Sequence, residues 1–128
     1  MMPMSPMLFA LVTLCGGLGA VLRYGIDAFI SARTGDVLPW GTITINVSGS
    51  FALGFATGMA ANAHLNEAWL LAVGTGLLGG YTTFSTATVD TLRLLQAGRP
   101  FASLANALGT LLATVLAALA GFLLSSLL

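Results

Sequence analysis

The sequence has no lysine, one cysteine, one histidine and very few charged residues. Charged side chains make up 6% of the 128 residues, against roughly a quarter in a soluble domain, and the formal net charge is zero. This composition argues against a soluble globular domain and offers no basic surface for nucleic acid. One cysteine excludes an internal disulfide, and one histidine without a neighbouring ligand argues against a metal cluster.

The side chains that enzyme active sites need are also missing. No nucleophile–base pair, metal cluster or pair of carboxylates can be assembled from this sequence. We therefore expect that the protein is not an enzyme.

Apolar length is what the sequence has in excess. Apolar residues make up 57% of the chain, and the mean hydropathy is +0.97. A membrane-spanning helix needs about 20 predominantly apolar residues. Four segments meet this need: residues 7–30, 40–63, 69–95 and 101–127. We expect an all-α membrane protein whose residues 1–128 form a single transmembrane domain of four helices.

The third of these segments is poor helix material near its middle. Gly79 and Gly80 each cost a helix about 1 kcal/mol relative to alanine. Serine and threonine compete with helix formation by bonding to nearby backbone. Five hydroxyl-bearing residues follow the two glycines: Tyr81, Thr82, Thr83, Ser85 and Thr86. The pattern favours a helix broken inside the membrane, where freed backbone groups can hold ions. The alternative is a glycine kink that only lets neighbouring helices pack closely.

Three of the four segments carry a stripe of polar residues at i+4 spacing. The stripes are Asn46–Ser50, Thr82–Thr86 and Asn106–Thr110–Thr114. Together they predict a narrow, nearly uncharged path, which suits a small permeant ion better than a proton-coupled pump. Two interpretations of Asn46 stay open, pore lining or bridging between helices. The hydroxyls either form a ladder of donors or bond back to their own helices.

The few charged residues lie near the ends of the segments. Arg23 and Asp27 share a helix face, which suits either an interfacial ion pair or an arginine at the mouth of a vestibule that attracts anions. Asp90 is either an interfacial carboxylate or part of the polar face of the third segment. All four arginines belong to the side of the two odd loops, and the positive-inside rule then predicts cytoplasmic odd loops and external termini.

Small residues on the first two segments predict close helix packing. Gly54 and Gly58 form a Gly-x-x-x-Gly element in the second segment, and Gly16 and Gly19 lie in the first. A bundle of four short helices is too thin to enclose a pore and a broken helix together. We expect these glycine faces to receive a second copy, so that the smallest assembly is a dimer.

Three motifs connect the sequence to a known family. They are Gly-Ala-Val-Leu-Arg at 19–23, Gly-Thr-Ile-Thr-Ile-Asn at 41–46 and Thr-Gly-Leu-Leu-Gly-Gly-Tyr-Thr-Thr-Phe-Ser-Thr at 75–86. Over almost its full length the chain resembles the Fluc (CrcB-type) fluoride channels. The resemblance implies an antiparallel, dual-topology dimer in the plasma or inner membrane, surrounded by lipid, which lets fluoride leave the cell passively through two pores.

The resemblance also implies roles for individual residues. A structural sodium ion on the two-fold axis would be held by backbone carbonyls at the positions of Gly79 and Thr82. Arg23 matches a vestibule arginine. The implied pore and fluoride residues are Asn46, Phe84, Ser85, Thr86, Thr110 and Thr114.

The chain departs from the family pattern at two positions. Ala87 stands where a second phenylalanine is usual, and Asp90 where glutamate is usual. We therefore keep the hypothesis of altered conduction, or of an obligate subunit that pairs with a paralogue. A small multidrug exporter is disfavoured because the first segment has no carboxylate except Asp27 near its end. A non-transporting assembly subunit is the remaining alternative, and in that case substituting Asn46 or Phe84 would leave ion flux untouched.

Overall fold

The computed structural model describes residues 4–128, and every regular element in that range is helical. The elements are α1 (Pro6–Ser31), α2 (Trp40–Ala61), α3 (Glu67–Leu70), η1 (Leu71–Leu78), α4 (Gly79–Tyr81), α5 (Phe84–Gln96) and α6 (Pro100–Ser125). Three of them, α1, α2 and α6, are long and apolar enough to cross a membrane. The residues of the predicted third span form the succession α3–η1–α4–α5, no member of which is long enough alone to cross a membrane.

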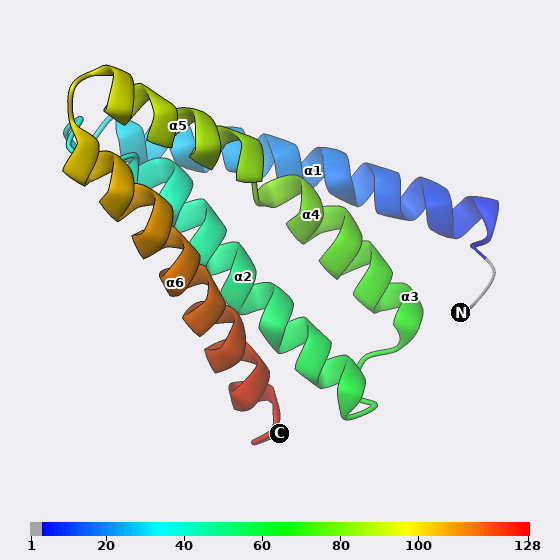
Figure 1. Ribbon diagram of the computed structural model, residues 1–128. Helices are drawn as coiled ribbons and strands as arrows, with labels where there is room; N and C mark the ends of the chain where they lie inside the picture. Colours follow the sequence, from blue (N-terminus) through cyan, green and yellow to red (C-terminus); the bar gives the residue numbers. More distant parts are fainter. Residues whose placement is uncertain (1–3) are drawn as a thin grey trace.

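The helices are arranged around two close pairs. Figure 1 shows α6 lying along α2, while η1 and α4 lie along α1. The short helix α5 leaves this second pair after the break and packs on α6. As a result, the break lies beside α2, with α5 and α6 forming one wall next to it.

Most large apolar side chains of the long helices point outward. Only a few, such as Ile45 and Ala72 at 1% exposed, form an interior core. In the most hydrophobic stretches of α1 and α6 only 6% of the residues are buried inside the chain. This arrangement suits a lipid environment, where association depends on close packing and polar contacts more than on hiding apolar surface.

The predicted break in the third segment is confirmed, but it lies further along the chain than the glycines. Helix α4 includes Gly79 and Gly80 and ends at Tyr81. Thr82 (φ −78°, ψ 158°) and Thr83 (φ −149°, ψ 122°) are extended, and α5 begins at the next residue. The eight residues before α4 form a π-helix, a rare geometry that often marks functional sites.

The glycines near the break have a packing role. A Cβ atom on Gly80 would overlap the carbonyl oxygen of Gly16, and a Cβ on Gly19 would overlap that of Leu77. The backbones of α1 and of the η1–α4 segment therefore approach more closely than any side chain allows. Gly80 thus serves the contact with α1, and the threonines after the glycine pair form the break.

The glycine faces predicted to receive a second copy are instead occupied within the chain. On α2, a Cβ on Gly54 would overlap the Ala118 carbonyl oxygen, and one on Gly58 would overlap the Ser125 hydroxyl. Both contacts are with α6. The expectation that these faces form a dimer interface was wrong, because small-residue stripes look the same in sequence whichever helix they contact.

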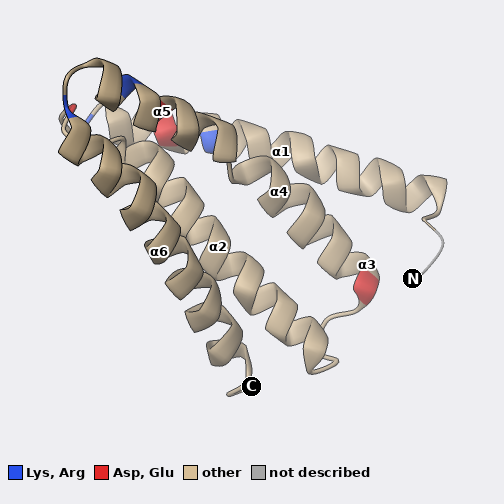
Figure 2. Cartoon of the chain, viewed as in Figure 1, with Lys and Arg blue, Asp and Glu red and all other residues tan. Residues whose placement is uncertain are grey.

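Charged residues gather at the end of the molecule that holds the loop before α2 and the loop before α6, as Figure 2 shows. There the Arg99 guanidinium donates to the carbonyl oxygens of Asp36 (2.7 Å) and Val37 (2.6 Å). This fork ties the loop before α2 to the loop before α6. Glu67 lies at the opposite end, on α3.

Candidate ion-conducting site

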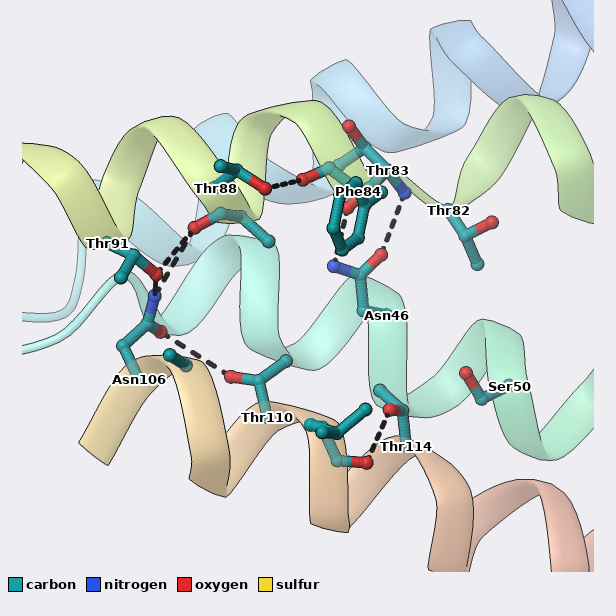
Figure 3. A pocket seen from close by; sticks show the side chains of 13 residues that line it. Asn46, Ser50, Thr82, Thr83, Phe84, Thr88, Thr91, Asn106, Thr110 and Thr114 are labelled. Carbon is teal, nitrogen blue, oxygen red and sulfur yellow. Dashed lines mark hydrogen bonds between the residues drawn. The ribbon is translucent and has the colours of Figure 1, made fainter. Parts of the chain in front are cut away.

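A pocket of about 440 Å³ lies beside the break, between α2, α5 and α6 (Figure 3). Two of its sides carry the polar stripes predicted on α2 and α6, and the third carries the first turns of α5. Its lining residues are Asn46, Ser50, Thr82, Thr83, Phe84, Ala87, Thr88, Thr91, Asn106, Ala107, Thr110, Leu111 and Thr114. The lining contains amides, hydroxyls and apolar groups but no charged side chain.

Asn46 holds the broken backbone through two hydrogen bonds to a single residue. Its Nδ2 donates to the Thr83 carbonyl oxygen, and its Oδ1 accepts from the Thr83 amide, both at 2.8 Å. Both residues are 8% exposed. This pairing fixes the orientation of the amide, since Thr83 N–H requires an acceptor and its carbonyl a donor. Asn46 therefore bridges α2 to the break and also lines the pocket. The bridging interpretation is confirmed, and the pore-lining role stays a prediction.

Thr83 also starts α5. Its Oγ1 accepts from the Thr86 amide at 3.2 Å, the usual N-cap bond of a threonine. The same hydroxyl lies 3.1 Å from Thr86 Oγ1 and 3.3 Å from Ser85 Oγ. Ser85 and Thr86, both predicted pore residues, therefore belong to a hydroxyl cluster at the start of α5 and do not line the pocket of the single chain.

The polar stripe of α6 faces the pocket along three turns. Asn106, 3% exposed, donates to Thr91 Oγ1 at 2.8 Å and lies 3.5 Å from the Ala87 carbonyl. Thr110 Oγ1 donates to Asn106 Oδ1 at 3.5 Å, and Thr114 Oγ1 donates to the Leu111 carbonyl at 2.9 Å. Asn106 and Thr110 are thus connected through side-chain contacts, whereas the Thr114 hydroxyl bonds back to its own helix.

The pocket is open on the side of Phe84. This side chain lines the pocket and is 88% exposed, which is unusual for a phenylalanine in a helical bundle. Ala87, one turn along α5, contributes only a methyl group to the same lining. Phe101 at the start of α6 is similarly exposed, at 87%.

The charged residues near the loops before α2 and α6 have other partners than the sequence suggested. Within residues 4–128 one ion pair is present, between Arg93 and Asp90 at 3.5 Å. An ion pair of Arg23 with Asp27, one of the two interpretations left open by the sequence, is therefore absent from the described residues. Asp90 also accepts from Thr42 Oγ1 at 2.9 Å and so links α5 to α2. Arg23 is half-buried in α1 and lies outside the pocket lining.

The two positions expected to hold a cation both have carbonyls released from the helix. The carbonyl of Gly79 loses its i+4 donor because the Thr83 amide donates to Asn46. The carbonyl of Thr82 loses its i+4 donor because the Thr86 amide donates to Thr83 Oγ1. Free backbone carbonyls are ligands that suit a hard cation.

Sequence reasoning missed two residues on which the site depends. Thr83 joins the break to α2, and Thr91 joins α5 to α6 by accepting from Asn106 and, through its carbonyl, from Ser103 (2.8 Å). A threonine directly before the helical segment could have indicated Thr83 as an N-cap, since threonine is preferred there. No local pattern singled out Thr91, whose partners lie on another helix.

Long apolar helices packed around an interrupted one, with an uncharged polar pocket at the interruption, define a multi-pass membrane protein. Comparison with known sequences agrees with this class. The family profile described as CrcB-like protein, Camphor Resistance (CrcB), matches residues 10–122. The chain belongs to this family, as its three motifs predicted.

Curated relatives match over most of their length. The fluoride-specific ion channel FluC 2 of Nocardia farcinica is 42% identical over 125 residues, 97% of this chain and 86% of the relative. That of Thermus thermophilus is 38% identical over 114 residues, 89% of this chain and 90% of the relative. FluC 1 of Rubrobacter xylanophilus is 39% identical, covering 92% and 93%. The family is one of ion channels, which confirms that the protein is not an enzyme.

Proposed function

We propose that this chain is a subunit of a fluoride-selective ion channel that lets fluoride leave the cell passively. The observation that carries the proposal is the pocket of neutral donors against the break, with Asn46 at its centre. Fluoride is small and strongly hydrated, so it must exchange water for other hydrogen-bond donors. Amides, hydroxyls and aromatic ring edges provide such donors. Because none of them carries a full positive charge, they bind the ion without trapping it.

The working assembly we propose is an antiparallel dimer with its two-fold axis in the membrane plane. A break in mid-membrane needs a cover of protein or water, because lipid leaves its backbone groups unsatisfied. Two features at the break are uncovered in the single chain and would be covered by a second copy: the ring of Phe84 and the backbone at Gly79. The ring of Phe101, at the start of α6, is also uncovered.

A structural sodium ion fits the residues at the break. Two copies would provide four carbonyl oxygens, two from Gly79 and two from Thr82, all without their helical donors. The bound cation would balance the four carbonyl dipoles and join the two subunits. The chain itself keeps the carbonyls available, because Asn46 and Thr83 hold the amides that would otherwise occupy them.

A heterodimer with an oppositely oriented paralogue is the second candidate. Two features favour it, the arginines gathered toward one end of the molecule and the methyl group of Ala87 in the pocket. One-sided arginines favour a single orientation in the membrane. An antiparallel dimer would then need a different chain for the opposite orientation.

Ion efflux from liposomes that contain the purified chain alone tests the proposal. We expect fluoride efflux with little chloride efflux under the same gradient. Efflux only after co-reconstitution with a paralogue would support the heterodimer. Absence of fluoride efflux in both preparations would contradict the channel proposal.

Ala87→Phe is expected to raise the fluoride-to-chloride ratio by roughly tenfold, equivalent to about 1.4 kcal/mol of discrimination. The ring narrows the pocket and replaces water with a weakly positive edge that suits a small anion. Ala87→Leu is the matched control, with similar bulk but no ring edge. Parallel efflux assays measure both variants, and an unchanged ratio in the phenylalanine variant would refute this role for position 87.

A further inference from the structure

The hydroxyl groups of the pocket differ in whether their single proton is already engaged. Six threonines line the pocket, and each donates to an oxygen of this chain. The donors are Thr82, Thr83, Thr88, Thr91, Thr110 and Thr114. A hydroxyl has one proton to donate, so each of these must give up a hydrogen bond before it can donate to a passing anion.

Ser50 is the exception among the pocket hydroxyls. It lies on α2 and lines the pocket, and Figure 3 shows its hydroxyl in the pocket without a hydrogen bond to any residue drawn. No half-buried or buried side chain within residues 4–128 has an oxygen that lacks both a partner and access to solvent. The Ser50 hydroxyl, which has no partner, is therefore accessible, and its residue lines the pocket.

Asn46, which lies one turn before Ser50 on the same face of α2, also has a free donor. Its Nδ2 carries two protons, and the bond to the Thr83 carbonyl uses one of them. Residues at i and i+4 of a helix lie one above the other. The free N–H of Asn46 and the free O–H of Ser50 therefore serve one stretch of the pocket.

We propose that Ser50 is a direct ligand of the permeating anion and that, with Asn46, it forms an anion-binding station on α2. The inference rests on the proposed function and adds a residue to it. Fluoride accepts a stronger hydrogen bond than chloride does, because its charge is concentrated on a smaller ion. A free hydroxyl at this station therefore favours fluoride, whereas each engaged threonine must first give up a hydrogen bond before it can donate.

Three variants of the full chain test the station in proteoliposomes. Ser50→Ala removes the donor, Ser50→Thr keeps it, and Thr57→Ala removes an exposed hydroxyl of the same helix that bonds to Leu53 outside the pocket. Ser50→Ala is expected to raise the fluoride concentration for half-maximal efflux about tenfold, the effect of one lost hydrogen bond to a charged partner. Maximal efflux should persist, the threonine variant should restore the original value, and Thr57→Ala should not change it.

An unchanged half-maximal concentration in Ser50→Ala would overturn the inference. Equal loss of fluoride and chloride efflux in both the alanine and threonine variants would also overturn it, because it would indicate a packing role. If the unmodified chain shows no efflux, the proposed function fails, and ¹⁹F NMR titration of the purified protein with fluoride decides the inference separately. Weaker fluoride binding in Ser50→Ala than in Thr57→Ala supports it, and equal binding refutes it.

Discussion

Replacing Asn46 with aspartate is expected to lower fluoride efflux at least ~100-fold, a change of about 2.7 kcal/mol. The aspartate keeps an acceptor for the Thr83 amide but loses the donor to the Thr83 carbonyl. It also places a negative charge beside the pocket. At 4 Å two unit charges repel by about 4 kcal/mol at an effective dielectric of 20. Fluoride efflux from proteoliposomes measures the effect.

Asn62→Asp is the matched control for this variant. Asn62 follows the same helix and bonds to the Ser125 carbonyl at 3.4 Å, outside the pocket. Its replacement should leave fluoride efflux within about twofold of the unmodified chain, because the side chain is exposed, lies outside the pocket and makes only this long hydrogen bond. If fluoride efflux through Asn46→Asp also stayed within about twofold of the unmodified chain, the anion would not pass this residue.

Gly19→Ala is expected to destabilise the protein by about 3 kcal/mol or more, the upper end of the usual cost of overpacking. The new methyl group would overlap backbone atoms, the Leu77 carbonyl and the Tyr81 amide, which have no rotamer to change. Helix α1 and the η1–α4 segment would then separate beside the break. The change in stability is measured by unfolding the detergent-solubilised protein with heat or with a denaturant.

The neighbouring glycine provides the control. A Cβ on Gly17 has no atom within 4 Å, so Gly17→Ala should leave stability unchanged or raise it by up to about 1 kcal/mol through better helix propensity. The two variants differ by the same methyl group on one helix. Equal stability of the two would contradict the close approach of α1 to η1–α4.

The broken helix was predictable from the sequence, but the residues responsible were only partly so. Gly79 and Gly80 are poor helix formers, yet both are helical, and the close packing of Gly80 on α1 outweighs its intrinsic preference. Thr82 and Thr83 are extended because the Thr83 backbone has a better partner in Asn46 than in the preceding turn. Local propensity marked the right region and could not show this long-range partner.

The sequence correctly predicted which residues of the polar stripes share an inward face, but not which helix each face contacts. Periodicity placed Asn46 and Asn106 on inward faces, and both are buried and bonded. Periodicity could not show which helix each face meets, since that depends on the tertiary arrangement. The same limit explains the error about Gly54 and Gly58, whose stripe faces α6 of the same chain.

The central claim is that the anion passes through the pocket between α2, α5 and α6. Cys15 is the only cysteine, so Cys15→Ser gives a background in which a single new thiol can be placed. In that background Ala87→Cys lies in the pocket lining, and Leu112→Cys lies on α6 outside it. The decisive measurement is fluoride efflux before and after a small water-soluble thiol reagent. The account predicts block of the first variant and none of the second; continued efflux through a fully modified Ala87→Cys channel would contradict it.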